Sequence, residues 1–197
     1  MRFWDRLTNL GDPFMTLPLA CLVLLWLGAS HRRRIVLVWA IFLALASLLV
    51  GVTKFAYAGW HIQIRQWHFT VVSGHTMLST AVYPVLGCMT LRALGRWGAA
   101  TGAAGGFLLA LAIGVSRVMI GVHSMPEVVA GWLLGSLVSG AVLAALARYA
   151  EEPPAAPALF VSISLVLALV CYGHVAPIQT WIVESAPALS HLLSQTL

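Results

Sequence analysis

Six long apolar runs constrain this chain more than any other feature of its sequence. They lie at about residues 14–30, 35–53, 76–91, 98–116, 128–147 and 158–175. A helix needs about 17–25 apolar residues to cross the hydrocarbon core of a bilayer, whereas a membrane β-barrel shows alternating segments of about ten residues. Only 9% of the residues are charged, against about a quarter in a soluble domain. The sequence therefore predicts an all-α, polytopic membrane helical bundle with about six transmembrane helices.

The arginines between the apolar runs predict how the bundle is oriented. They fall in the first, third and fifth connections, as His31-Arg32-Arg33-Arg34, Arg92 with Arg96, and Arg148. By the positive-inside rule this face is cytoplasmic, so the second and fourth connections and both termini face outward; Arg2 and Arg6 oppose this orientation. Because the positive charges lie in short clusters beside apolar runs, they favour lipid headgroups over nucleic acid as partners.

We expect one integral membrane domain over residues 1–197, with interfacial segments at its two ends. Residues 1–12 mix aromatic and charged side chains, which suits an interfacial N-terminal segment. Residues 176–197 are predicted to form an interfacial C-terminal tail. Within this tail, leucines recur at helical spacing behind Pro187, at Leu189, Leu192, Leu193 and Leu197.

Two of the apolar runs carry small residues at four-residue spacing. They are Gly102, Gly106, Ala110 and Gly114 in the fourth run, and Gly131, Gly135 and Ser139 in the fifth. Such stripes allow helix backbones to approach closely in a membrane. The pattern predicts that the fourth run packs tightly against the fifth.

The start of the third run is a candidate anion site. Ser73-Gly74-His75 opens this run, and a helix N-terminus offers unpaired N–H groups and the positive end of the helix dipole to an anion. His75 could deliver a proton near neutral pH. The alternative is that Ser73 only caps the helix and that His75 is an interfacial histidine.

The fourth connection adds Arg117, His123 and Glu127. The guanidinium of Arg117 suits phosphate oxygens. Glu127 follows His123 by four residues, so its carboxylate could orient the imidazole and raise its nucleophilicity. Alternatively, Glu127 and Ser124 form a capping box at the start of a helix. The residue types leave both readings open.

Taken together, these residues resemble the motifs of the type 2 phosphatidic acid phosphatase (PAP2) family, a family of membrane lipid phosphatases. The most specific part is Ser116-Arg117, five residues, His123, three residues and Glu127; Ser73-Gly74-His75 and Lys54 precede it. The segment Thr8-Asn9-Leu10-Gly11-Asp12 is similar to one that bacterial members carry just ahead of a membrane span. The resemblance covers about residues 8–147.

The resemblance implies a role for each of these residues. His123 would attack phosphorus and form a phosphohistidine, Glu127 would orient His123, and His75 would protonate the leaving group and later activate water. The phosphate oxygens would be bound by Lys54, Arg117, Ser73 and the backbone of Gly74. Because phosphoryl transfer depends mainly on positioning and charge stabilisation, we expect neither a metal nor another cofactor.

The chain departs from the family pattern at three positions. Val72 stands where the second motif has proline, and Glu127 stands where the third has aspartate. The first motif has an arginine followed by proline, but here that position, counted from Lys54, is His61 with no proline after it. Arg65, or His61 when it is protonated, is the candidate replacement for binding phosphate.

The leading hypothesis is a phosphatase that hydrolyses a phosphate or pyrophosphate monoester of a lipid at the outer, periplasmic face of a bacterial inner membrane. Candidate substrates are undecaprenyl pyrophosphate, phosphatidylglycerol phosphate, phosphatidic acid and a lipid A phosphate. One alternative is a lipid phosphotransferase with the same phosphohistidine. Another is a non-catalytic lipid-binding protein with a decayed site. The expected partners are the phosphorylated lipid and membrane lipids, with no nucleic acid, and the sequence leaves the oligomeric state open.

Overall fold

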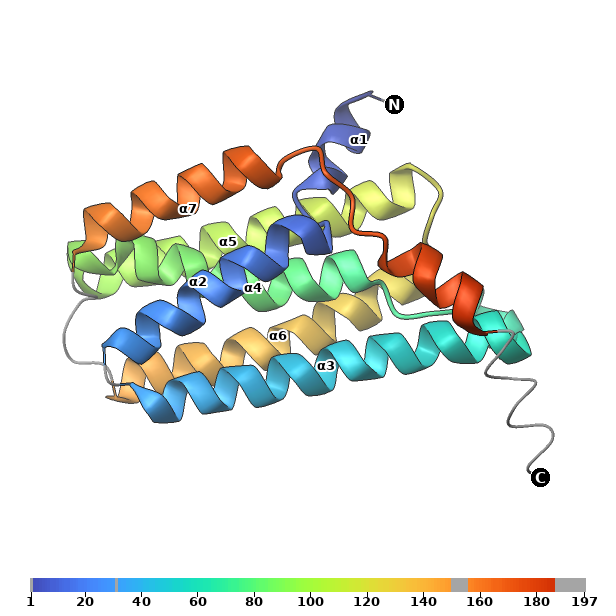
Figure 1. The fold of residues 1–197 in the computed structure, drawn as a ribbon, viewed down its shortest axis with the longest axis horizontal. Helices are drawn as coiled ribbons and strands as arrows, with labels where there is room; N and C mark the ends of the chain where they lie inside the picture. Colours follow the sequence, from blue (N-terminus) through green and yellow to red (C-terminus); the bar gives the residue numbers. More distant parts are fainter. Residues whose placement is uncertain (1, 31, 150–155, 187–197) are drawn as a thin grey trace.

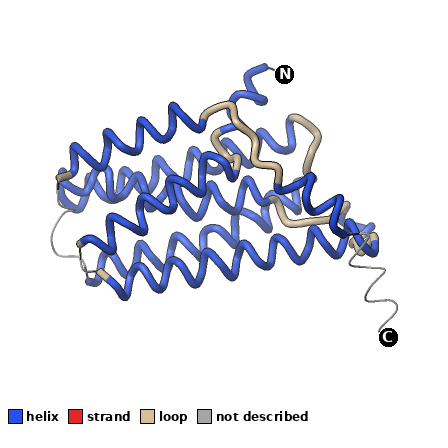
Figure 2. The backbone as a smooth tube through the Cα atoms, in the orientation of Figure 1, coloured by secondary structure: helices blue, strands red, loops and turns tan. Residues whose placement is uncertain are grey.

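The computed structural model describes residues 2–30, 32–149 and 156–186 (Figure 1). These residues form a bundle of helices joined by short connections, and they contain no β-strand beyond an isolated bridge between Ile64 and Phe69 (Figure 2). A last helix covers residues 178–186. The other helices are α1 (Arg2–Asn9), α2 (Pro13–Ala29), α3 (Arg33–Trp60), α4 (Gly74–Leu91), α5 (Gly95–Met119), α6 (Met125–Tyr149) and α7 (Pro157–Cys171), with 3-10 turns η1 (Arg65–Trp67) and η2 (Arg92–Leu94).

The predicted helical membrane bundle is confirmed. Each of the six apolar runs forms one of the helices α2 to α7. In the part of the chain that the structure describes, four stretches are long and apolar enough to cross a membrane: Arg2–Ala29, Arg33–Trp60, Gly74–Met119 and Met125–Arg148. The third of these stretches contains both α4 and α5, which η2 joins, while α7 is an apolar helix of 15 residues.

Helix α4 is the most enclosed helix of the bundle, and the small-residue stripes face it. A side chain at Gly102 of α5 would overlap the backbone of Gly87, and one at Gly135 of α6 would overlap the backbone of Met77. Both stripes therefore pack on the third apolar run rather than on each other, which corrects the predicted pairing of the fourth run with the fifth. Gly114 is the exception, because it lies against Val128 of α6 as well as against α4.

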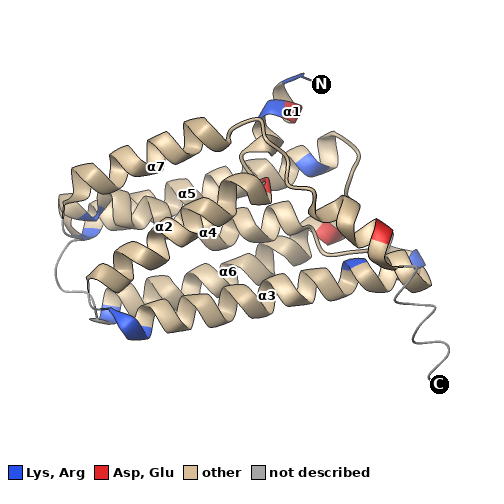
Figure 3. Ribbon diagram, viewed as in Figure 1, with Lys and Arg blue, Asp and Glu red and all other residues tan. Residues whose placement is uncertain are grey.

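Charged side chains gather at the two ends of the bundle (Figure 3). The α2–α3 connection, η2 and the end of α6 lie at one end, where Arg92 donates a hydrogen bond to the carbonyl of Leu146 at 3.2 Å. The described helix ends on either side of the first, third and fifth connections therefore lie at one end of the bundle, as predicted. The α3–α4 and α5–α6 connections lie at the other end together with α1 and the helix 178–186. Which end faces the cytoplasm stays a prediction; His31 and the leucines after Pro187 fall outside the described residues.

Candidate active site

His123 and Glu127 form a buried pair between α5 and α6. The Nδ1 atom of His123 lies 2.7 Å from Oε2 of Glu127, and the two side chains are 9% and 4% exposed. The same Oε2 accepts a hydrogen bond from the backbone N–H of Ser124 at 3.1 Å. One oxygen of Glu127 therefore both contacts the imidazole and accepts from the backbone at the start of α6. The capping box is only half formed, because the Ser124 hydroxyl has no hydrogen-bond partner among the described residues.

The second carboxylate oxygen of Glu127 holds the segment that leads into α4. Oε1 accepts from the backbone N–H of Thr70 at 2.7 Å and of Val71 at 3.2 Å, and also from the Thr70 hydroxyl. The next N–H, of Val72, donates to Oγ1 of Thr53 on α3 at 3.2 Å. Glu127 thus connects the imidazole to this segment through its two oxygens. An aspartate is one methylene shorter and would not span the same two sets of partners without movement of the backbone.

The N-terminus of α4 keeps its first N–H groups available. Ser73 occupies the N-cap position but forms no side-chain capping bond; its hydroxyl instead lies 2.9 Å from that of Thr76. Among the described residues, no group accepts a hydrogen bond from the N–H groups of Gly74, His75 and Thr76. A side chain at Gly74 would meet only Val50, at an ordinary 3.4 Å, so protein packing does not require glycine here. These features fit an anion that approaches the helix end closely.

His75, in the first turn of α4, also has a buried carboxylate partner. Its Nε2 atom lies 3.5 Å from Oδ2 of Asp12, which is 4% exposed. Asp12 is the N-cap residue of α2. Its Oδ1 atom accepts hydrogen bonds from the backbone N–H of Phe14 at 2.8 Å and of Ala176 at 2.9 Å. Gly11 lets this segment lie against the bundle, because a Cβ atom there would overlap Ile113 and approach the Cβ of His75 to 3.3 Å.

Asp12 was not among the predicted site residues. Its place directly before Pro13 predicts a helix N-cap, and Asp12 is the N-cap of α2. The resemblance of segment 8–12 to bacterial family members was the only hint of another role. A carboxylate that contacts one ring nitrogen fixes the orientation of an imidazole. Asp12 is therefore suited to hold the His75 ring in position.

Arg117 brings a guanidinium to the two histidines from the last turn of α5. Its Nη1 atom donates to the hydroxyl of Thr8 at 3.0 Å. Its Nε atom is buried and has no hydrogen-bond partner among the described residues. Arg117 interacts electrostatically with both His75 and His123. A buried donor without an acceptor costs about 1–3 kcal/mol, and an oxygen of a bound phosphate would remove this cost.

Lys54, near the end of α3, supplies a second positive charge. It too interacts electrostatically with His75 and His123. Its Nζ atom donates to Oε1 of Gln179 at 2.8 Å, although 125 positions separate the two residues in the sequence. Sequence reasoning missed Gln179, because nothing in the local pattern of the tail indicates that the helix 178–186 returns to α3.

His61 and Arg65 lie outside this cluster. His61 is the C-cap of α3 in a left-handed conformation with φ of 56°, and Arg65 begins η1. Both side chains are exposed, and neither forms a hydrogen bond or ion pair with the other candidate residues that the structure describes. Their predicted role in binding phosphate stays a prediction, and the residue found beside Lys54 is Gln179.

The environment of His123 favours the neutral imidazole. Burial lowers its pKa below the ordinary value of 6.5, and the positive charges of Arg117 and Lys54 lower it further, while Glu127 opposes the shift. Because the carboxylate of Glu127 accepts from Nδ1, the proton of the neutral ring is on Nδ1. The Nε2 atom then carries the lone pair, as a nucleophile requires.

In residues 2–30, 32–149 and 156–186, no group of three or more His, Cys, Asp or Glu residues is arranged to hold a metal ion. The expectation of chemistry without a metal or cofactor stays a prediction.

Comparisons with known proteins agree with the motifs. The family model of the PAP2 superfamily matches residues 59–151, which include His75, Arg117, His123 and Glu127 but neither Lys54 nor the N- and C-terminal segments. An uncharacterized 22.5 kDa protein in the cps region of Klebsiella pneumoniae is 30% identical to this chain over 196 residues, which are 96% of this chain and 92% of that protein. No solved structure matches the chain.

Proposed function

This chain belongs to the PAP2 superfamily, and from this premise we propose that it is a membrane phosphatase that hydrolyses a phosphate or pyrophosphate monoester of a lipid. Membership of the superfamily supports a phosphatase-type activity. The observation that carries the proposal is the cluster at one end of the bundle. There, His123 and His75 each face a buried carboxylate, and both interact with the positive charges of Lys54 and Arg117.

In the first step, Nε2 of His123 attacks the terminal phosphorus, and the bond from this phosphorus to the leaving oxygen breaks; that oxygen is the lipid oxygen of a phosphate monoester or the bridging oxygen of a pyrophosphate. His75 gives its proton to the leaving oxygen, so that the alcohol or the lipid monophosphate leaves with this oxygen protonated. Charge on the transferring phosphoryl group is stabilised by Arg117, Lys54 and the free N–H groups at the start of α4. The product is a phosphohistidine on His123.

In the second step, water replaces the lipid oxygen. His75, now neutral, accepts a proton from the water as its oxygen attacks phosphorus, and the bond from phosphorus to Nε2 of His123 breaks. Inorganic phosphate leaves, and both histidines return to their starting protonation states. Glu127 and Asp12 act as positioning residues, since they fix the two rings.

A lipid substrate is supported by where the cluster lies. It is at the ends of apolar helices, where a headgroup at the membrane surface can reach it while the lipid chain stays in the bilayer. Exposed apolar side chains flank it in the α3–α4 connection, at Ile62, Ile64 and Trp67, and such side chains suit the interface of a membrane. With the predicted orientation, the reaction takes place at the outer face of a bacterial inner membrane.

The helix 178–186 is part of this proposal. The first family motif lacks its arginine here, and Gln179 occupies the space beside Lys54. While Oε1 of Gln179 accepts from Lys54, its amide N–H groups are suited to donate to a phosphate oxygen. Gln179 therefore supplies a neutral donor beside Lys54, whereas the first family motif supplies an arginine, which points to binding of phosphate with less electrostatic attraction.

The test is phosphate release from a panel of lipids by purified protein in detergent. The panel contains dioctanoyl phosphatidic acid, phosphatidylglycerol phosphate, a polyprenyl pyrophosphate and a lipid A phosphate. We expect His123→Ala to abolish release from the lipid that the parent hydrolyses, whereas His68→Ala, an exposed histidine of the α3–α4 connection, keeps the parent rate. Equal release by parent and His123→Ala would refute the mechanism. Labelled phosphate that appears on a second lipid would instead indicate a phosphotransferase.

A further inference from the structure

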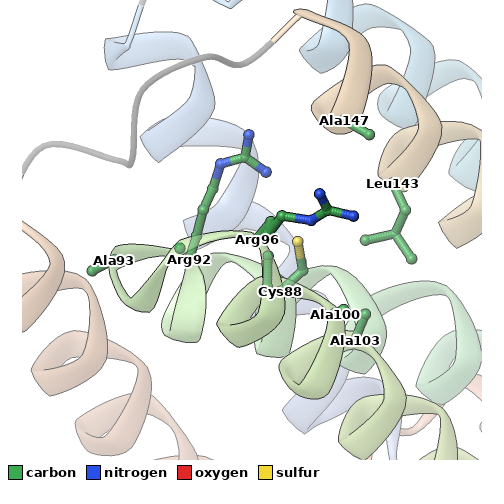
Figure 4. Close-up of a pocket in the computed structure, with 10 residues that line it drawn as sticks. Cys88, Arg92, Ala93, Arg96, Ala100, Ala103, Leu143 and Ala147 are labelled. Carbon is green, nitrogen blue, oxygen red and sulfur yellow. The ribbon is translucent and has the colours of Figure 1, made fainter.

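A second feature lies at the opposite end of the bundle, where a cavity of about 530 Å³ opens among α4, α5 and α6. Its lining combines small apolar side chains with two arginines (Figure 4). The residues that matter here are Arg92, Arg96, Ala100, Ala103, Leu143 and Ala147. None of them belongs to the candidate active site.

The cavity results from how α5 and α6 pack. The two helices are in contact near the candidate active site, where Gly114 lies against Val128. At the other end, the side chains that α5 presents to the space beside α6 are alanines, including Ala100 and Ala103. Methyl groups are too short to fill this space, and Leu143 of α6 closes one side of it (Figure 4). The result is an apolar groove along α5 and α6.

The two arginines lie at the end of this groove, in and next to η2. Arg96 is exposed; its guanidinium lies 5.2 Å from the centre of the Trp97 ring, and Figure 4 shows its side chain extended toward Leu143. Arg92 donates to the carbonyl of Leu146. The groove thus offers an apolar surface along the helices and positive charge where the helices end. An anionic phospholipid has the complementary arrangement, with apolar chains below a phosphate.

We propose that this cavity binds one anionic phospholipid from the leaflet at the arginine-rich end of the bundle. The phosphate contacts Arg96 with support from Arg92, and an acyl chain lies along Ala100 and Ala103 against Leu143. Basic pockets between membrane helices recognise lipid headgroups in this way. Because the candidate active site is at the other end of the bundle, this lipid is a bound component of the membrane and not the substrate.

The experiment measures how many lipids the purified chain retains. Native mass spectra are recorded during titration with phosphatidylglycerol, or with phosphatidylcholine as the lipid without net charge. We expect one phosphatidylglycerol to bind in preference to phosphatidylcholine. Arg96→Gln should weaken its binding about five-fold, since one arginine near anionic headgroups contributes about 1 kcal/mol. Ala103→Leu, which fills the groove but keeps the charges, should weaken binding of the same lipid.

The matched control is Arg33→Gln, an exposed arginine at the start of α3 that does not line the cavity. It should bind phosphatidylglycerol as the parent does. An equal loss in Arg33→Gln and Arg96→Gln would show general surface attraction and would overturn the proposal, as would equal binding of the two lipids. If Ala103→Leu changes the mass from dimer to monomer with no loss of lipid, the cavity is an interface between two copies and the proposal is wrong. Each variant is compared with the parent by circular dichroism and elution volume.

Discussion

Replacing Glu127 with glutamine tests the reasoning about the active site most directly. The change keeps the shape of the side chain but turns one of its two accepting oxygens into a donor. The structure gives each oxygen only donors as backbone partners: Thr70 and Val71 for Oε1, and Ser124 for Oε2. The amide oxygen is expected to face Thr70 and Val71, since the amide NH₂ would otherwise oppose two N–H groups. The NH₂ group then faces His123 and Ser124.

Two consequences of different size follow from this orientation. The N–H of Ser124 loses its acceptor, which costs about 1–3 kcal/mol of folding free energy. More important, an NH₂ group donates to Nδ1 of His123 and moves the ring proton to Nε2, the atom that must attack phosphorus. A wrong imidazole tautomer lowers kcat by about 10⁴-fold in serine proteases. We expect a loss of at least about 10³-fold here, which corresponds to about 4 kcal/mol in the barrier.

The assay is phosphate release from the lipid that the parent hydrolyses, at saturating substrate in detergent. Thr70→Val is the matched control, because it removes the hydroxyl that donates to Oε1 but leaves the backbone N–H bonds and the contact with His123. It should keep the rate within about ten-fold of the parent, because the lost hydrogen bond affects mainly folding stability and leaves the tautomer of His123 unchanged. A Glu127→Gln variant that keeps more than a tenth of the parent kcat would refute the tautomer argument.

Three further predictions concern Arg117, Gln179 and the packing of α6 on α4. Arg117→Gln removes a positive charge that lowers the pKa of His123, so that pKa rises and the acid limb of the pH profile of kcat/KM moves to higher pH; an unmoved limb would show that the charge does not act on the imidazole. Gln179→Ala should raise KM about five-fold, and Gln179→Glu should raise it more, because a carboxylate neutralises Lys54 and repels phosphate; equal KM values in parent and both variants would exclude Gln179 from substrate binding. Gly131→Ala should lower the free energy of unfolding by about 1–3 kcal/mol, since its Cβ would lie 2.6 Å from the carbonyl of the residue before α4. Denaturation in detergent measures this effect, and Gly140→Ala, where a Cβ meets nothing within 4 Å, should be neutral.

The sequence by itself determined the helical membrane bundle and pointed to most of the chemical groups of the candidate active site. Apolar length and the placement of arginines are local properties of the chain, because each helix must satisfy its own backbone in a bilayer. The contact between His123 and Glu127 could also be predicted from the sequence, since side chains four residues apart lie close together in a helical turn. Glu127 contacts both the imidazole of His123 and the backbone of Ser124, because one carboxylate oxygen can accept more than one hydrogen bond.

Only the tertiary structure decided which distant residues lie beside the predicted site residues. Asp12 reaches His75 because Gly11 allows the segment before α2 to lie against the bundle, and Gln179 reaches Lys54 because the helix 178–186 returns to the end of α3. The small-residue stripes showed that helices pack closely but not which helix they meet, and they meet α4. Spacing from Lys54 pointed to His61 and Arg65, yet both lie in an exposed connection. Periodicity describes the faces of one helix, whereas contacts between residues far apart in sequence depend on how the helices are packed.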